Sequence, residues 1–138
     1  MDDVKALNEL YKIVAMGIIG IDEVKGNIDD KTLAKTMSDA KKKYLVNKMD
    51  ITNMLKELGE KPAKVSVIAK TFSELYTGIE LIKCDDAKIA KMLIEGTNKG
   101  IIKVEEILNS DMDKKVTKLA EELLELLEFQ IKSWKPYL

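Results

Sequence analysis

The chain contains 138 residues, with 23 basic and 24 acidic side chains and a formal net charge of −1. Hydrophobic residues make up 46% of it, which excludes general disorder, and its length fits one domain over residues 1–138. Histidine is absent, and every basic residue is a lysine. The chain therefore lacks the commonest general base and metal ligand, and it lacks the arginine fork that binds phosphates and guanine. A charge close to zero also argues against a nucleic-acid partner.

Features of the sequence that bear on its compartment point to the cytoplasm. Cys84 is the one cysteine, so no internal disulfide can form and a reducing compartment is expected. The chain starts with Met1-Asp2-Asp3, unlike the basic start of a secretory signal. The apolar run at residues 13–21 is far shorter than the ~20 residues that cross a bilayer. We therefore expect no membrane association.

Apolar residues at spacings of three and four predict two long helices in the first half of the chain. The first covers residues 3–27 and the second covers residues 31–58. The pair Asp29-Asp30 supplies the N-cap of the second helix, and Gly59 marks its end. The expected core stripes are Val4, Leu7, Tyr11, Val14, Ile18 and Ile21 in the first helix, and Leu33, Met37, Ala40, Tyr44, Asn47, Ile51, Met54 and Leu58 in the second.

Three further helices are expected at residues 64–83, 87–108 and 112–135. The pair Asp85-Asp86 provides an N-cap for the middle one, and residues 109–111 form a turn that caps the last. Their expected core stripes are Val65, Ile68, Phe72, Leu75, Ile79 and Ile82, then Ile89, Leu93, Gly96, Gly100, Val104 and Ile107, and finally Val116, Leu119, Leu123, Leu126 and Gln130.

The lengths of the connections set the expected topology. The first two helices and the last two are each joined by a few residues, so each pair forms an antiparallel hairpin. Residues 59–85 separate the hairpins and include a helix long enough to return the chain. We therefore predict an all-α, ferritin-like antiparallel four-helix bundle with a helical crossover between its second and third helices. The resemblance of residues 20–28 to residues 100–108 fits such a pseudo-twofold arrangement.

Four short segments, which are mostly caps and helix spacing, carry a resemblance to a known family. They are Leu7-Asn8-Glu9-Leu10, Leu58-Gly59-Glu60-Lys61-Pro62, Asp85-Asp86 and Glu95-Gly96. Through them the chain, from Leu7 onward, resembles small ferritin-like bundle proteins whose function is unassigned. The resemblance implies the fold and little about mechanism. The wider ferritin-like superfamily often holds two iron ions on Glu-x-x-His motifs, and a chain without histidine departs from that pattern.

At the positions of a di-iron site, carboxylates remain only in the last two expected helices. Glu125 and Glu128 stand three residues apart on one helical face, and Glu95 lies on the preceding helix. Three oxygen ligands suit one divalent cation such as Mn²⁺, Mg²⁺ or Ca²⁺. The simpler interpretation is an exposed acidic flank paired with lysines, and the protein then has no cofactor. No pattern indicates catalysis, so we expect a protein that is not an enzyme.

Gly17, Gly20, Gly96 and Gly100 fall inside expected helices, where each costs about 1 kcal/mol relative to alanine. Their placement predicts that the first helix and the helix at residues 87–108 cross closely, backbone against backbone. The alternative is space for a small ligand in the centre of the bundle.

Several polar and aromatic residues occupy positions on or near the apolar stripes. The amides Asn47 and Gln130 would fix helix register or pair with each other, or else bind a trapped water or small polar molecule. Phe72 is expected in the core. Trp134 and Tyr137 are expected to cover the mouth of the bundle or to form a patch for a partner.

Together these features favour a non-catalytic scaffold that forms a homo-oligomer or binds a protein partner through an apolar face. A carboxylate site for one divalent cation on the last two helices is the alternative. The two differ in whether Glu95, Glu125 and Glu128 converge or fan out into solvent.

Overall fold

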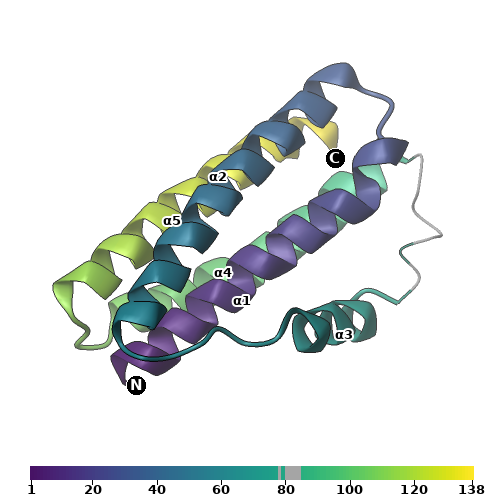
Figure 1. Cartoon of the computed structure of the whole chain (residues 1–138). Helices are drawn as coiled ribbons and strands as arrows, with labels where there is room; N and C mark the ends of the chain where they lie inside the picture. The colour runs from purple at the N-terminus through teal and green to yellow at the C-terminus, as the bar shows by residue number, and fades with distance from the viewer. Residues whose placement is uncertain (78, 80–84) are drawn as a thin grey trace.

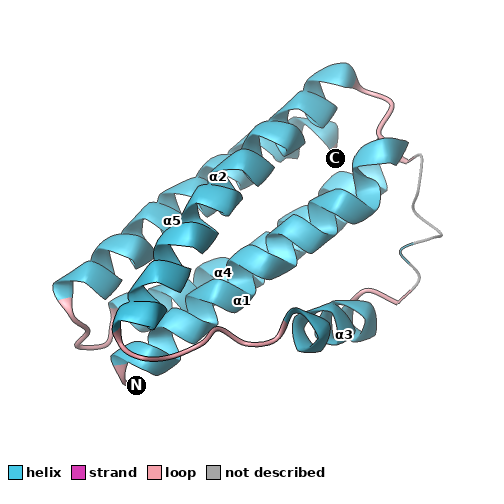
Figure 2. Ribbon diagram, viewed as in Figure 1, coloured by secondary structure: helices cyan, strands magenta, loops and turns pink. Residues whose placement is uncertain are grey.

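The computed structural model describes residues 1–77, 79 and 85–138, and within these residues it contains helices and no strands (Figure 1 and Figure 2). The α-helices are α1 (Asp3–Val24), α2 (Lys31–Glu57), α3 (Val65–Leu75), α4 (Asp86–Leu108) and α5 (Lys114–Trp134). The 3-10 helices η1 (Lys25–Asn27) and η3 (Lys135–Tyr137) follow α1 and α5. No helix of the described part is long and apolar enough to span a membrane. The predicted all-α class is confirmed.

The long helices α1, α2, α4 and α5 lie side by side along one direction (Figure 1). α1 and α2 form one antiparallel pair, and α4 and α5 form another. The pairs contact each other through α1 with α4 and α2 with α5. α2 and α4 run in the same direction, because the segment between them carries the chain back along the long helices (Figure 1).

Aspartates begin all four long helices. Backbone N–H groups donate to aspartate side chains at 2.8 to 3.0 Å, in the pairs Lys5 to Asp2, Leu33 to Asp30, Lys88 to Asp85 and Lys115 to Asp113. Such caps satisfy donors that the first helical turn leaves unpaired. The caps predicted at Asp30 and Asp85 are confirmed, whereas Asp113, and not residues 109–111, caps the last helix. Gly59 has a φ of 73°, the left-handed conformation expected of the predicted cap after α2.

The inward faces of the long helices form the hydrophobic core. All but two residues of the stripe predicted in α1 are buried, and the exceptions, Val4 and Ile18, are partly buried. Trp134 is buried, and Tyr137 packs partly buried against the same core. These two aromatic residues therefore belong to the end of the core and do not form an exposed patch for a partner.

Backbone hydrogen bonds to aspartates also join the two helix pairs at both ends. The carboxylate of Asp86, at the start of α4, accepts the N–H groups of Asp29 at 3.1 Å and Asp30 at 2.9 Å. At the opposite end, the carboxylate of Asp3 accepts the N–H group of Asp113 at 3.1 Å. The turns between paired helices are thereby fixed to the start of a helix in the other pair.

α3 is shorter than predicted. It ends at Leu75 instead of residue 83, and a turn follows at Tyr76. Residues 78 and 80–84, which include Cys84, lie outside the described part of the chain. The 11 residues of α3 span about 16 Å, so this helix alone does not carry the chain back along the long helices.

Part of the predicted apolar face of α3 packs against α1. Phe72 is buried as predicted, and so is Ile68. Val65, at the start of the helix, and Leu75, at its end, are exposed, which the prediction did not foresee. The contact with α1 therefore depends on Ile68 and Phe72, which lie one turn apart on α3.

Candidate functional site

An exposed apolar surface lies on the outer side of α2 and α5. Its members are Leu45, Val46 and Met49 of α2, which are 45%, 61% and 66% exposed, and Phe129 of α5, which is 58% exposed. We call these four side chains the α2–α5 surface. Val46 and Phe129 line one hollow between the two helices, and Met49 lies one turn along α2 from Val46 and Leu45. Large apolar side chains that are exposed together, rather than singly, mark binding surfaces.

The α2–α5 surface follows from the register of α2. Tyr44 and Ile51 are buried in the core, so the residues at 45, 46 and 49 face away from it. The sequence prediction followed only the core stripe and missed this surface. The sequence did contain a signal for this surface, because Leu45, Val46 and Met49 are apolar and lie outside the core stripe of α2.

Charged side chains border the α2–α5 surface. Lys43 of α2 and Glu122 and Glu125 of α5 line the same hollow as Val46 and Phe129. The Lys43 ammonium lies 5.2 Å from the centre of the Phe129 ring, within the range of a cation–π contact. An apolar centre with a charged rim is the usual composition of a protein interface.

The three carboxylates predicted as metal ligands do not converge. Glu95, Glu125 and Glu128 are all exposed. Glu95 borders a hollow beside α3 and α4, together with Lys88, whereas Glu125 borders the α2–α5 surface. Within the described residues, no group of three or more acidic, cysteine or histidine side chains could hold a metal ion. The three carboxylates are therefore exposed, as the simpler interpretation expected, and the alternative of a converging cation site does not fit them, because the carboxylates of α4 and α5 face different sides of the molecule.

The glycines of α1 and α4 do not bring two backbones together. A Cβ atom at Gly17 would lie 2.6 Å from the ring of Tyr44, and one at Gly96 would collide with the hydroxyl of Tyr76. Aromatic side chains from α2 and from the end of α3 thus occupy the space beside these glycines. The predicted backbone crossing is wrong, because side chains lie where the second backbone was expected.

All four glycines instead line a groove between α1 and α4, which α3 borders. We call it the α1–α4 groove. It has a volume of about 220 Å³. Its apolar walls include Ile13, Met16, Phe72, Met92, Leu93 and Leu127. The glycines therefore do line a space, as the alternative interpretation expected, but this space is an open groove on the α1 and α4 side and not a cavity in the centre of the bundle.

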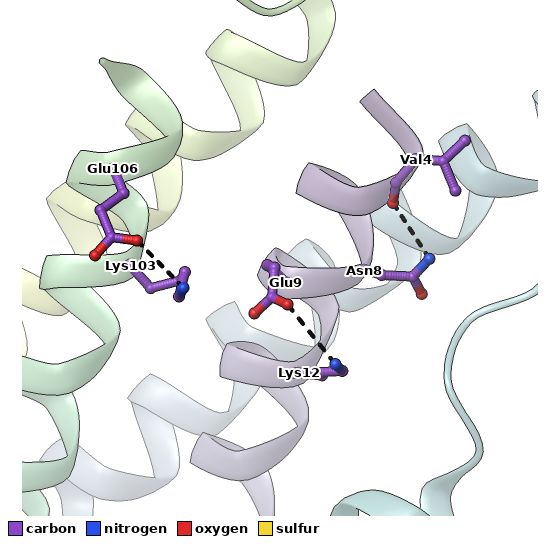
Figure 3. A network of polar contacts seen from close by, with 6 residues as sticks. All are labelled: Val4, Asn8, Glu9, Lys12, Lys103 and Glu106. Atoms are coloured by element: carbon purple, nitrogen blue, oxygen red, sulfur yellow. Dashed lines mark hydrogen bonds and ion pairs between the residues drawn. The ribbon is translucent and has the colours of Figure 1, made fainter. Parts of the chain in front are cut away.

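Charged side chains from both helices line the α1–α4 groove. Glu9 and Lys12 come from α1, and Lys99 and Lys103 come from α4. Lys12 pairs with Glu9 at 3.7 Å, and Lys103 pairs with Glu106 at 3.2 Å (Figure 3). Figure 3 shows Glu9 and Lys103 extending from their helices toward the space between α1 and α4. The groove thus has an apolar interior and a charged edge.

A buried hydrogen bond lies behind the groove. The hydroxyl of Tyr44, a residue that lines the groove, donates to Oε1 of Gln130 at 2.7 Å. Burial raises the pKa of the Tyr44 hydroxyl far above its usual range, so this group stays protonated and acts as a donor. Asn47 is only partly buried and borders the α2–α5 surface. The predicted pairing of the two amides is therefore wrong, and Gln130 pairs with a tyrosine of the same helix as Asn47.

Comparison with protein families matches residues 2–110 to a family described as a domain of unknown function, DUF2383. The matched range contains α1 to α4 and ends before α5. Searches of curated proteins and of solved structures found no match. Because the family model covers well over half of the sequence, the chain belongs to the DUF2383 family.

Proposed function

We propose that the protein is a non-catalytic helical scaffold that self-associates through the α2–α5 surface. The observation that carries this proposal is the joint exposure of four large apolar side chains on two neighbouring helices. Removing apolar surface from water is favourable by about 25 cal/mol per Å². A molecule that covers the α2–α5 surface therefore gains free energy that the isolated chain does not have.

A second copy of the chain fits this surface better than an unlike partner, because the rim carries both charges. Lys43 lies on the α2 side, and Glu122 and Glu125 lie on the α5 side. In a twofold dimer the same surface meets itself. With the twofold axis parallel to the helices, α2 of one copy faces α5 of the other. Each lysine then lies opposite the acidic pair of the second copy.

The ferritin-like arrangement and the absence of catalysis belong to the same proposal. Two antiparallel helix pairs with a long connection between them support the ferritin-like arrangement. The lack of histidine in the sequence supports a non-enzymatic role without a cofactor. The single cysteine supports a reducing compartment such as the cytoplasm.

Sedimentation equilibrium of the purified protein tests self-association. We expect the unchanged chain to form dimers and the double variant Val46→Glu/Met49→Glu to dimerise roughly tenfold or more weakly. The reason is that the variant would bury carboxylates in the interface. The matched control is Ile102→Glu, because Ile102 is exposed to the same extent as Val46, at 61%, but lies on α4. This control should dimerise like the unchanged chain.

Two results would overturn the proposal. The first is an unchanged chain that stays monomeric at millimolar concentration. The second is an equal loss of dimer in the Ile102→Glu control and in the double variant, because association would then not depend on the α2–α5 surface.

A further inference from the structure

We propose that the α1–α4 groove binds a small amphipathic anion, with its apolar chain between the two helices and its acidic group at the lysines of the rim. The site is independent of self-association. The groove lies on the α1 and α4 side of the molecule, and the α2–α5 surface lies on the other side (Figure 1). The size of the groove, its apolar walls and the charge of its rim carry the proposal.

The groove is large enough for an organic molecule. Its volume is about 220 Å³, and an apolar cavity of about 150 Å³ is enough to take up benzene. Gly20, Gly96 and Gly100 line it without side chains, although glycine is less favourable than alanine inside a helix. A Cβ atom at Gly20 would lie 3.5 Å from side-chain atoms of Leu93 and Phe72, which is an ordinary van der Waals distance. The Tyr76 hydroxyl already occupies the space beside Gly96, and a Cβ atom at Gly100 would lie 3.2 Å from Ile13. Gly20 is therefore the glycine at which a longer side chain would fill the groove.

The walls of the groove are apolar and come from several helices. Met16 of α1, Leu93 of α4 and Phe72 of α3 all contribute. The rings of Phe72 and Tyr76, with centroids 4.8 Å apart, together border the groove on the side of α3. Such walls suit a hydrocarbon chain, and methionine side chains adapt to its shape.

The rim of the groove has an excess of positive charge. Lys12, Lys99 and Lys103 line it, against one glutamate, Glu9. Among the described residues, the Lys99 ammonium has no ion pair, so it is available to an acidic group of a ligand. Thr97, a residue that is 9% exposed, also lines the groove, and its hydroxyl has no hydrogen-bond partner in the described part of the chain. A carboxylate beside Lys99 would gain a charge-assisted hydrogen bond from its ammonium.

Isothermal titration calorimetry of the full chain with hexanoate, octanoate and 1-octanol tests the proposal. Octanoate should bind saturably and about fifteenfold more tightly than hexanoate, because each buried methylene contributes about a fourfold factor, equivalent to ~0.8 kcal/mol. Octanoate should also bind roughly tenfold more tightly than the neutral 1-octanol, because charge-assisted hydrogen bonds are the strong ones.

Charge variants test the rim. Lys99→Gln should weaken octanoate binding several-fold and leave 1-octanol binding unchanged, because only the anion interacts with the ammonium. The matched control is Lys132→Gln, since Lys132 is exposed on α5 and does not line the groove. This control should bind both probes like the unchanged chain.

Substitutions that fill the groove test the location. Met16→Trp should abolish octanoate binding, whereas Met112→Trp, at a partly buried methionine outside the groove, should retain it. Circular dichroism shows whether each variant folds, and Gly20→Val replaces Met16→Trp if that variant does not. The double variant Val46→Glu/Met49→Glu should still bind octanoate, which separates this site from the α2–α5 surface.

Three results would overturn the proposal. The first is the absence of saturable octanoate binding, and the second is unchanged octanoate affinity in a folded groove-filling variant. The third is equal affinity for octanoate and 1-octanol, because the rim lysines would then not select an anion.

Discussion

Gly17 and Gly20 lie on the same helix and line the same groove, but they have different neighbours. A Cβ atom at Gly17 would lie 2.6 Å from the ring of Tyr44, which is buried and held by a hydrogen bond. A Cβ atom at Gly20 would lie 3.5 Å from side-chain atoms of Leu93 and Phe72, an ordinary van der Waals distance. The same substitution should therefore have opposite effects at the two positions.

We predict that Gly17→Ala lowers the free energy of unfolding by about 1–3 kcal/mol, because the buried Tyr44 ring must move. Gly20→Ala should raise it by up to about 1 kcal/mol, because alanine is the better helix former and its methyl group has room. Urea unfolding followed by circular dichroism measures both values. A gain in stability for Gly17→Ala would contradict the close contact with Tyr44.

The Tyr44–Gln130 hydrogen bond is a buried polar contact between α2 and α5. The Nε2 atom of Gln130 is buried and has no hydrogen-bond partner among the described residues, so the amide is only half satisfied. A buried polar group left without a partner costs about 1–3 kcal/mol, whereas apolar replacement of both partners is nearly neutral. The pair should therefore behave as a strongly coupled unit.

A double-mutant cycle tests this coupling. Tyr44→Phe should lower the free energy of unfolding by about 1–3 kcal/mol, because it leaves Oε1 of Gln130 without a donor. Gln130→Met should lower it less, because this change also removes the unpaired Nε2 atom. The double variant should lie close to the unchanged protein in urea unfolding. Losses that simply add would show that the two side chains act independently.

At the scale of the elements, α3 differs from the long helices. It has 11 residues, and no side-chain hydrogen bond caps its first turn at Lys64. It packs against α1 through the buried side chains of Ile68 and Phe72. Because short helices obtain most of their stability from such packing, α3 should open more easily than the rest of the molecule.

Hydrogen exchange of the variant Phe72→Ala tests this expectation. Loss of the buried ring should lower the local stability of α3 by about 3 kcal/mol or more and accelerate exchange there, with little change in α2. Val65→Ala is the control, because Val65 is 57% exposed and its truncation should change stability by less than about 0.5 kcal/mol. Equal acceleration in α2 and α3 would contradict a separately opening α3.

The long helices were predictable from the sequence because each combines an apolar stripe with an aspartate before its first turn. Their observed ends lie within one helical turn of the prediction. The end of α3 could not be predicted in the same way, because the helix ends at Leu75 although its apolar stripe continues further along the sequence. Thr77 and Gly78 were the available signal, since both residue types are poor helix formers.

The candidate sites were less predictable than the elements, because they depend on contacts between distant segments. The glycines are visible in the sequence, but Tyr44 and Tyr76, which lie beside them, come from other helices and cannot be assigned from periodicity. Glu95 and Glu125 lie on paired helices, yet the rotation of each helix turns them to different sides. Prediction of the α2–α5 surface would have required attention to the apolar residues of α2 that lie outside its core stripe.

At the scale of the whole molecule, the two proposed binding regions lie on opposite sides. The α2–α5 surface lies on the neighbouring helices α2 and α5, and the α1–α4 groove lies between the neighbouring helices α1 and α4 (Figure 1). A dimer formed through the α2–α5 surface therefore leaves the groove open. Self-association and ligand binding can be changed separately by substitution.

Nuclear magnetic resonance of isotope-labelled methionine methyl groups tests the location of self-association most directly. The chain has 7 methionines, among them Met49 in the α2–α5 surface and Met16 and Met92 in the groove. As the protein concentration rises from micromolar to millimolar, we predict that the Met49 methyl resonance shifts while those of Met16 and Met92 stay in place. A shift confined to Met16 or Met92, or no shift at any methionine, would contradict self-association through the α2–α5 surface.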